Sequence, residues 1–172
     1  EISDAIAEFQ TAGKPVIAAG DFYTQAHYLL ASQADHILLH PEGGMFLEGF
    51  SVYRSYLKTF LEKIRVTMHV FRAGESKSAV EPYLRDDMSE TERRIVTQWL
   101  GGLWSTYTQH AEAGRDLPEG EMDRFIANFG GRLQASNNDL AETILAGGWV
   151  DVLADHSGME DALAEWVGVT DE

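Results

Sequence analysis

The chain has 172 residues, enough for one domain with a single apolar core and short for two. Its hydrophobic content of 44% and aromatic content of 10% are typical of a globular protein. Thirteen basic residues stand against 28 acidic ones, and the net charge of -15 disfavours binding to nucleic acid or to anionic lipid.

The sequence also lacks cysteine and any long apolar run, which limits the kinds of site and segment that it can form. Cysteine does not occur, which excludes disulfides, zinc–thiolate sites and cysteine nucleophiles. No apolar run of about 18 residues is present, and the first residues do not have the pattern of a signal peptide. The chain begins inside a helical pattern, with Ile2, Ile6 and Phe9 on one face and no initiating Met. We therefore interpret it as part of a longer protein, incomplete at its amino-terminal end.

Helix and strand patterns alternate through the first half. The expected order begins with a helix ending near Gly13, a buried strand at 16–20, a helix at 24–34 and a buried strand at 36–39 that the turn sequence HPEGG closes. A short strand at 46–50, an amphipathic helix at 53–64 and a strand at 66–71 follow. This alternation favours an α/β fold with parallel strands.

Helices dominate the second half. Ser89 and Glu92 have the spacing of a capping box, which predicts the start of a long helix that ends near Gly114. A short helix, a helix from about Asp139 to the Gly147–Gly148 pair, a short strand or turn and a final helix at 158–169 follow. No repeat or linker interrupts the chain, so we expect a single domain over 1–172.

The stretch GESKSAVEPYLRDDM, residues 74–88, places Lys77 at what is expected to be the first turn of a helix. A helix N-terminus is electrostatically unfavourable for a cation and lowers a lysine pKa, as a general base requires. Nearby Glu81 acts in the opposite direction and is expected to be structural. From the local residues alone, Lys77 is either an ordinary exposed lysine beside serine caps or a proton acceptor.

Other candidate sites are disfavoured. The six histidines are His27, His36, His40, His69, His110 and His156, and no pair has HExxH spacing or an accompanying carboxylate cluster. The four glycine pairs match neither GxGxxG nor GxxxxGK[ST], and no GxSxG elbow occurs. We expect no metal and no cofactor.

Three segments in order resemble the signal peptide peptidase A family, also called protease IV. They are GKPVIAAGDFYTQAHYLLASQADHILLHPEG, VTMHVFRAGESKSAVEPYLRDDMSETER and ILAGGWVDVL. The likeness extends from about Ala7 to Val167 and is greatest to the amino-terminal half of the long, two-domain bacterial form. It implies a Clp/crotonase-like fold of stacked ββα units with outer helices.

The resemblance also implies an activity. Members of the family are anchored in the bacterial inner membrane, face the periplasm and degrade cleaved signal peptides with a Ser–Lys dyad. Lys77, in the KSAVEP block, is the implied general base. The implied partners are an extended apolar peptide substrate, a carboxy-terminal domain that carries the serine, and further copies in a homo-oligomer.

The implied nucleophile position departs from the family pattern. Gln25 stands where the family has its serine, Ala26 and His27 replace the small residues that follow, and Ser32 lies well past the position. A glutamine amide is no nucleophile, so residues 1–172 are expected to be inactive alone.

Two alternatives remain. A degenerate crotonase-like module kept for oligomer assembly would use Lys77 only structurally, and Gln25 partly supports that reading. A crotonase-type acyl-CoA enzyme would need a GGG-like stretch after a strand and carboxylates beside it, and the chain has neither.

Overall fold

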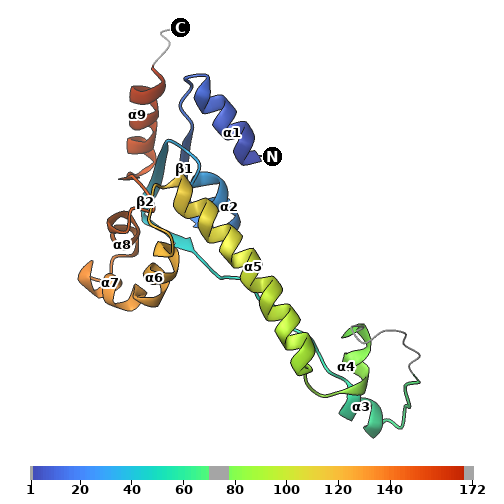
Figure 1. Cartoon of the computed structure of the whole chain (residues 1–172). Coiled ribbons are helices and arrows are strands. Elements are labelled where there is room, and N and C mark those ends of the chain that lie inside the picture. Colours follow the sequence, from blue (N-terminus) through green and yellow to red (C-terminus); the bar gives the residue numbers. More distant parts are fainter. Residues whose placement is uncertain (1, 70–77, 169–172) are drawn as a thin grey trace. The chain divides into compact units, whose positions relative to one another are not determined.

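The structure is a computed structural model that describes residues 2–69 and 78–168 (Figure 1). The chain forms two compact units, one made of Glu1–Gly49 with Thr106–Glu172 and the other of Phe50–Ser105. The expectation of a single domain over 1–172 stays a prediction.

A small parallel sheet lies at the centre of the first unit. Strand β1 (Ile17–Thr24) pairs with β2 (His36–Phe46), which pairs with β3 (Val152–Leu153), in the order β1-β2-β3. Helix α2 (Gln25–Ala31) connects the first two strands. Because a parallel pair requires such a crossover, the strand–helix–strand prediction for this region is confirmed.

The core of this unit surrounds β2. Ile37, Leu38 and Leu39 are fully buried, and each contributes about 1.5–3 kcal/mol through removal of its side chain from water. Tyr28 of α2 and Trp149 pack edge to face, and the Tyr28 hydroxyl donates a hydrogen bond of 2.6 Å to the Trp149 carbonyl. This bond ties α2 to a residue 121 positions later and so closes the unit.

Helices complete the first unit. They are α1 (Ile2–Thr11), the end of α5 (Glu90–Gly114), α6 (Glu121–Ala127), α7 (Phe129–Ala135), α8 (Leu140–Ala146) and α9 (His156–Val167). Asp139 and Asp155 cap α8 and α9, because their carboxylates accept the backbone N–H groups of Glu142 and Gly158. The predicted start of α8 is thus confirmed, and α9 begins two residues before its predicted start.

The second unit contains α3 (Lys58–Lys63), the 3-10 helix η1 (Ser78–Val80), α4 (Glu81–Leu84) and the first part of α5. Among its described residues no apolar side chain is buried, and Tyr53, Phe60 and Trp99 are 93%, 56% and 56% exposed. Polar contacts therefore contribute much of what orders this unit. Two of them join the start of α3 to the α4 segment, from Leu57 N to Pro82 O and from Thr59 N to Asp86 Oδ1.

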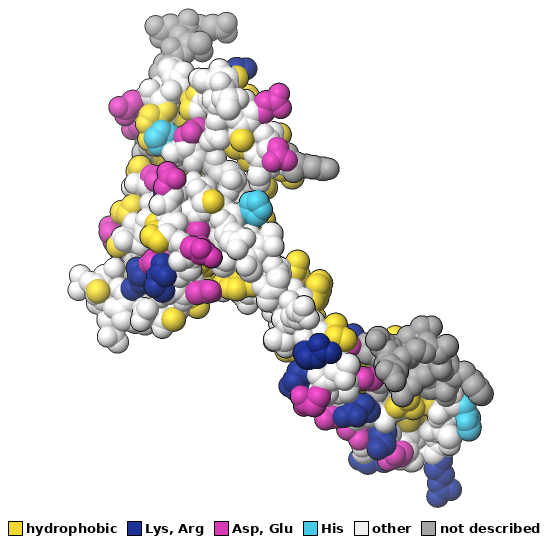
Figure 2. Space-filling model, viewed as in Figure 1, with side chains coloured by type: hydrophobic (Ala, Val, Ile, Leu, Met, Phe, Trp, Pro, Cys, Tyr) yellow, Lys and Arg dark blue, Asp and Glu magenta, His cyan; other side chains and the backbone are white. Residues whose placement is uncertain are grey.

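Charge is distributed unevenly between the two units. The sequence of Phe50–Ser105 holds nine basic residues against seven acidic ones, whereas the rest of the chain holds four against 21. Figure 2 shows the corresponding gathering of Lys and Arg side chains over the segments around α3 and α4. The sheet-bearing unit thus has a net charge of 4 − 21 = -17, and the unit whose sequence includes Lys77 has 9 − 7 = +2.

Several predicted elements differ from the structure. The HPEGG sequence does not end the second strand, because β2 continues to Phe46, and residues 47–50 are not strand. The helix predicted at 53–64 is reduced to α3, and residues 66–69 of the predicted strand at 66–71 are irregular, while 70 and 71 lie outside the described residues. The two later errors fall in the unit without a buried apolar core, where no packing supports the local preference.

No helix in the described part of the chain has both the length and the apolar content needed to cross a membrane.

Candidate functional site

Lys77, the predicted general base, lies outside the described residues. The structure begins again at the next residue, with η1 (Ser78–Val80) and α4 (Glu81–Leu84). Pro82 occupies the first turn of α4, where its missing N–H costs no helical hydrogen bond. What the structure describes is therefore the support of the segment that directly follows Lys77.

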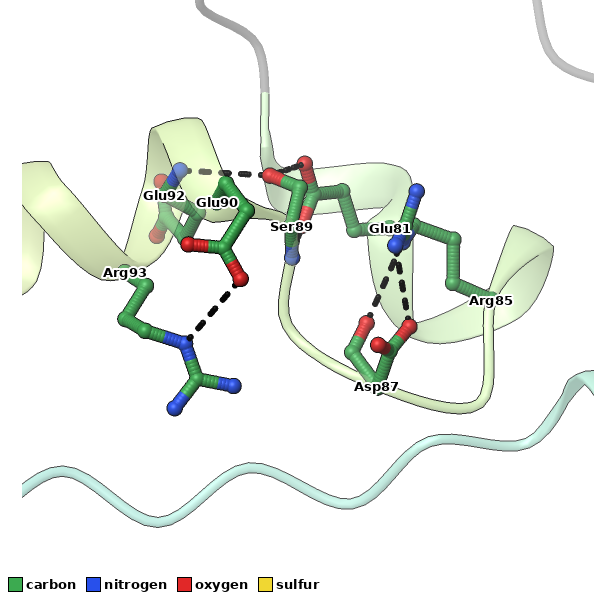
Figure 3. A network of polar contacts seen from close by, with 7 residues as sticks. All are labelled: Glu81, Arg85, Asp87, Ser89, Glu90, Glu92 and Arg93. Atoms are coloured by element: carbon green, nitrogen blue, oxygen red, sulfur yellow. Dashed lines mark hydrogen bonds and ion pairs between the residues drawn. The ribbon is translucent and has the colours of Figure 1, made fainter.

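Glu81 and Ser89 join this segment to the beginning of α5 (Figure 3). The Ser89 hydroxyl donates to Glu81 Oε1 at 2.6 Å, and the Ser89 backbone N–H donates to Glu81 Oε2 at 3.2 Å. Both carboxylate oxygens are thus held by a single residue. Such a two-point contact fixes the orientation of a carboxylate as well as its distance.

Ser89 is also the N-cap of α5, since its hydroxyl accepts the Glu92 backbone N–H at 3.2 Å. The capping box predicted for Ser89 and Glu92 is therefore half present. In a full capping box the Glu92 carboxylate would accept the Ser89 backbone N–H. Here Glu81 accepts that N–H, and the Glu92 carboxylate forms an ion pair of 3.1 Å with Arg54. Glu92 is the buried partner of this pair, with a side-chain exposure of 8%.

The pKa of Glu81 reflects the same contact. The hydrogen bond from the Ser89 hydroxyl is the main cause that lowers the Glu81 pKa below its ordinary value, and the Ser89 backbone N–H and the charges of Arg85 and Arg54 add to it. A carboxylate with a lowered pKa is charged at neutral pH. Its two contacts with Ser89 make Glu81 an anchor for the α4 segment, in agreement with the structural role expected from the sequence.

Gln25, at the implied nucleophile position, is the first residue of α2. Its Oε1 accepts the Gly49 N–H at 2.8 Å, and its Nε2 donates to the Gly49 carbonyl at 3.3 Å. Both polar atoms of the amide are engaged, and they hold the backbone just after β2. In this unit the implied nucleophile position therefore fastens the backbone that follows β2.

The residues beside Gln25, and Ser32 further along the chain, make structural contacts. The His27 N–H donates to the Thr24 hydroxyl, which caps α2. Ser32 is fully buried, and its hydroxyl donates to the Leu29 carbonyl and accepts from the Gln33 side chain. Its contacts are those of a structural serine.

Histidines come together at one place in the first unit. His156 Nε2 lies 3.0 Å from Asp21 Oδ1, and the rings of His40 and His156 are 5.4 Å apart. This proximity is not evident from the sequence, because the three residues come from three separate elements, β1, β2 and α9. Within residues 2–69 and 78–168, no group of three or more His, Asp or Glu residues is arranged to hold a metal ion.

An apolar groove of about 520 Å³ lies in the first unit. Aromatic and aliphatic side chains from the end of β2 and from three helices line it, among them Phe46, Leu47, Phe125, Phe129 and Leu140. Its volume falls in the range of ligand-binding clefts, which extends from about 300 to 1,000 Å³. Sequence reasoning could not identify these residues, since they become neighbours only in the folded unit.

Comparison with known proteins points to one family. The model of Peptidase family S49 matches residues 8–145. Similar proteins include Protease 4 of Salmonella typhi, 40% identical over 167 residues, and Protease 4 of Haemophilus influenzae, 43% identical over 127 residues. The chloroplastic serine protease SPPA of Arabidopsis thaliana is 24% identical over 126 residues.

These alignments cover different shares of the proteins. They include 97%, 74% and 73% of this chain, but only 27%, 20% and 19% of the three relatives. The chain thus spans about a quarter of the length of the curated relatives it matches. Its parallel sheet and surrounding helices confirm the α/β prediction and are consistent with the Clp/crotonase-like fold expected for this family.

Proposed function

Because the chain belongs to peptidase family S49, we propose that it is the lysine-bearing part of a serine peptidase, with Lys77 as the general base of a Ser–Lys dyad. The family match over residues 8–145 carries this proposal, because it includes both the KSAVEP block and the position of Gln25. The relatives named Protease 4 support a peptidase role.

The serine of the dyad comes from outside residues 1–172. Gln25 has no nucleophilic atom, and its amide is held by Gly49. Ser32 is fully buried. The partner is a further domain of the same protein, and residues 1–172 by themselves are inactive.

The local charge supports Lys77 as a base. A lysine accepts a proton at neutral pH only if its pKa is lowered, and neighbouring positive charge lowers it. Apart from Lys77, the sequence of Phe50–Ser105 holds eight basic residues against seven acidic ones, whereas the rest of the chain holds four against 21. The charged Glu81 carboxylate acts in the opposite direction, so the positive charge of the unit must outweigh it for Lys77 to act as a base.

The substrate class is an extended apolar peptide, such as a cleaved signal peptide. The apolar groove beside Phe46 and Leu47 supports this class, because side chains of such a peptide bind in apolar pockets. We place the protein at the bacterial inner membrane, facing the periplasm, as a homo-oligomer. The exposed apolar side chains of the second unit support assembly, since such surfaces mark contact sites.

A non-catalytic role in oligomer assembly is the second candidate. The engagement of Gln25 by Gly49 favours it, because a position once used for chemistry would then serve only structure. The two candidates differ in what they require of Lys77.

Substitution of Lys77 in the full-length protein tests the proposal. Lys77→Ala should lower kcat for an apolar peptide by about a hundredfold or more, the usual contribution of a general base. Lys77→Arg should be equally poor, because a guanidinium does not deprotonate near neutral pH. Lys63→Ala, at an exposed lysine of α3, is the matched control. Peptide cleavage by Lys77→Ala at the rate of the control would refute the dyad and leave the assembly role.

A further inference from the structure

We propose that the apolar groove of the first unit binds a peptide in which basic residues flank an apolar run, and that Glu48 selects this flank by pairing with it. The inference rests on the proposed function for the apolar peptide, and it adds the charge of the flanking residues and the side chain that binds them. Every side chain that lines the groove belongs to the described part of the first unit.

The lining of the groove is apolar at nine of its eleven positions, and the polar residues are Glu48 and Asn138. Two of the apolar side chains remain in contact with water, since Phe46 is 51% and Ile126 is 42% exposed. Removal of such surface from water is favourable when an apolar partner covers it. The groove therefore fits an apolar segment.

The apolar surface continues beyond the groove along the sheet. Phe22 of β1 is 52% exposed, and its ring centroid lies 5.7 Å from that of Phe46. Phe46 belongs to both surfaces, because it also lines the groove. An extended chain can thus place one side chain on the aromatic pair and another in the groove, as peptides do where pockets receive alternate side chains. This arrangement favours a peptide of several residues over a compact small molecule.

Glu48 is the one charged residue among the described residues that line the groove, and it is exposed. Its carboxylate forms no ion pair or hydrogen bond within the described part of the chain. By contrast, the basic side chains of α6 and α7, Arg124 and Arg132, are paired with Glu121 at 2.9 and 2.7 Å. Glu48 can therefore pair with a cation that a bound peptide supplies.

The charge of the whole unit acts in the same direction. Its sequence holds four basic residues against 21 acidic ones, an excess that attracts cationic ligands and repels anionic ones. An apolar run beside basic residues is the pattern of a signal peptide, in which a positively charged n-region precedes the apolar h-region. The groove and Glu48 together fit the junction between these two regions.

Binding of matched peptides to the full-length protein tests the proposal. The probes are fluorescein-labelled peptides of about ten residues that share one leucine–alanine run and are flanked by two lysines, two glutamines or two glutamates. Lys77→Ala serves as the parent, and fluorescence anisotropy is read directly after mixing, before any cleavage. We expect the lysine-flanked peptide to bind about threefold to fivefold more tightly than the glutamine-flanked one, which is the usual range for an exposed ion pair. The glutamate-flanked peptide should bind least tightly.

Substitutions in the same parent identify the groups responsible. Glu48→Gln should remove most of the lysine preference, and Glu48→Lys should make the glutamate-flanked peptide bind more tightly than the lysine-flanked one. Glu142→Gln, at an exposed carboxylate of α8 that does not line the groove, is the matched control and should keep the preference. Ile126→Ala should weaken the binding of all three peptides about fivefold, because it removes apolar contact area. At about 1 M salt, where charges are screened beyond about 3 Å, the preference of the parent should disappear.

The results separate failure of this inference from failure of the proposed function. A lysine preference that Glu48→Gln leaves intact, or that Glu142→Gln reduces equally, would show that Glu48 does not select the flank. An unchanged affinity in Ile126→Ala would show that the peptide binds elsewhere and that the groove has another occupant, such as a further part of the full-length protein. If Lys77→Ala cleaves the peptides at the wild-type rate, the dyad fails while the binding preference stands.

Discussion

Gln25 and Gly49 are joined by two hydrogen bonds, from Gly49 N to Gln25 Oε1 at 2.8 Å and from Gln25 Nε2 to Gly49 O at 3.3 Å. A side-chain amide here pairs with the main chain as a neighbouring strand would. The backbone that leaves β2 is thereby fastened to the first turn of α2. A side chain without matching donor and acceptor atoms cannot replace this contact.

Gln25→Ala should lower the free energy of unfolding by about 1–2 kcal/mol, since two part-buried backbone groups lose their partners. Gln25→Glu should be similarly destabilising, because a carboxylate cannot donate to the Gly49 carbonyl. Urea unfolding measures both. Gln134→Ala, at an exposed glutamine of α7, should change stability by less than about 0.5 kcal/mol. Equal midpoints for Gln25→Ala and Gln134→Ala would contradict the prediction.

Arg115 and Asp151 form a two-point ion pair that joins the end of α5 to the residue before β3. Arg115 Nη1 lies 3.1 Å from Asp151 Oδ2, Nη2 contacts Oδ1, and Nε donates to the Gly148 carbonyl. The Asp151 carboxylate also accepts the Ile37 N–H of β2 at 2.8 Å.

Arg115→Ala should lower the free energy of unfolding by about 2 kcal/mol, because the Arg115 side chain is only 10% exposed and its loss leaves a part-buried carboxylate without its charge partner. Arg124→Ala, which breaks a more exposed pair with Glu121, should cost less than about 1 kcal/mol. Denaturant unfolding compares the two. A cost for Arg115→Ala no larger than that for Arg124→Ala would show that the pair contributes little.

Tyr23 predicts how stability changes at alkaline pH. Burial raises its pKa to about 12, whereas an unfolded tyrosine ionises near about 10. Above pH 10 the unfolded state therefore binds fewer protons than the folded state, and stability falls as pH rises from 10 to 12. Below pH 10 this contribution is fully present. Burial also raises the pKa of Tyr28 and Tyr107, which adds to the same trend.

Tyr23→Phe should make the alkaline fall in stability shallower, and it should also cost about 1 kcal/mol at neutral pH through loss of the 2.8 Å bond to the Leu38 carbonyl. Urea unfolding at several pH values between 9 and 12 measures both effects. Tyr53→Phe, at a side chain that is 93% exposed, is the matched control. An unchanged alkaline slope in Tyr23→Phe would contradict the assignment.

Gly43 and Gly101 should respond to alanine in opposite ways. A Cβ at Gly43 would lie 2.0 Å from the Asp21 carbonyl oxygen, beside the irregularity in the β1–β2 register, so the strands would have to separate. A Cβ at Gly101, inside α5, would meet nothing within 4 Å.

We expect Gly43→Ala to destabilise the protein by more than about 2 kcal/mol and Gly101→Ala to stabilise it by up to about 1 kcal/mol, the helix preference of alanine over glycine. Thermal unfolding followed by circular dichroism measures both. A stabilising Gly43→Ala would mean that the two strands do not approach as closely as described.

Local sequence patterns correctly predicted the elements that are marked by capping residues, glycine stops or short apolar runs. Asp139 and the Gly147–Gly148 pair bound α8 as expected, and the apolar runs at 16–20 and 36–39 became paired parallel strands. Sequence patterns gave wrong predictions where contacts between distant segments determine the secondary structure. The amphipathic spacing at 53–64 became helix only over Lys58–Lys63, and β2 ran through its predicted turn because Gly43 allows close approach to β1.

For the candidate site, too, some features were identified from the sequence and others only from the structure. Lys77 and the absence of a serine at position 25 are properties of the sequence, which by itself was enough to identify the family. Only the tertiary structure showed that Gln25 forms hydrogen bonds with Gly49 and that Glu81 forms them with Ser89. Hydrogen bonds between residues eight or 24 positions apart depend on how the chain folds back, and neither spacing has a periodic signal in the sequence.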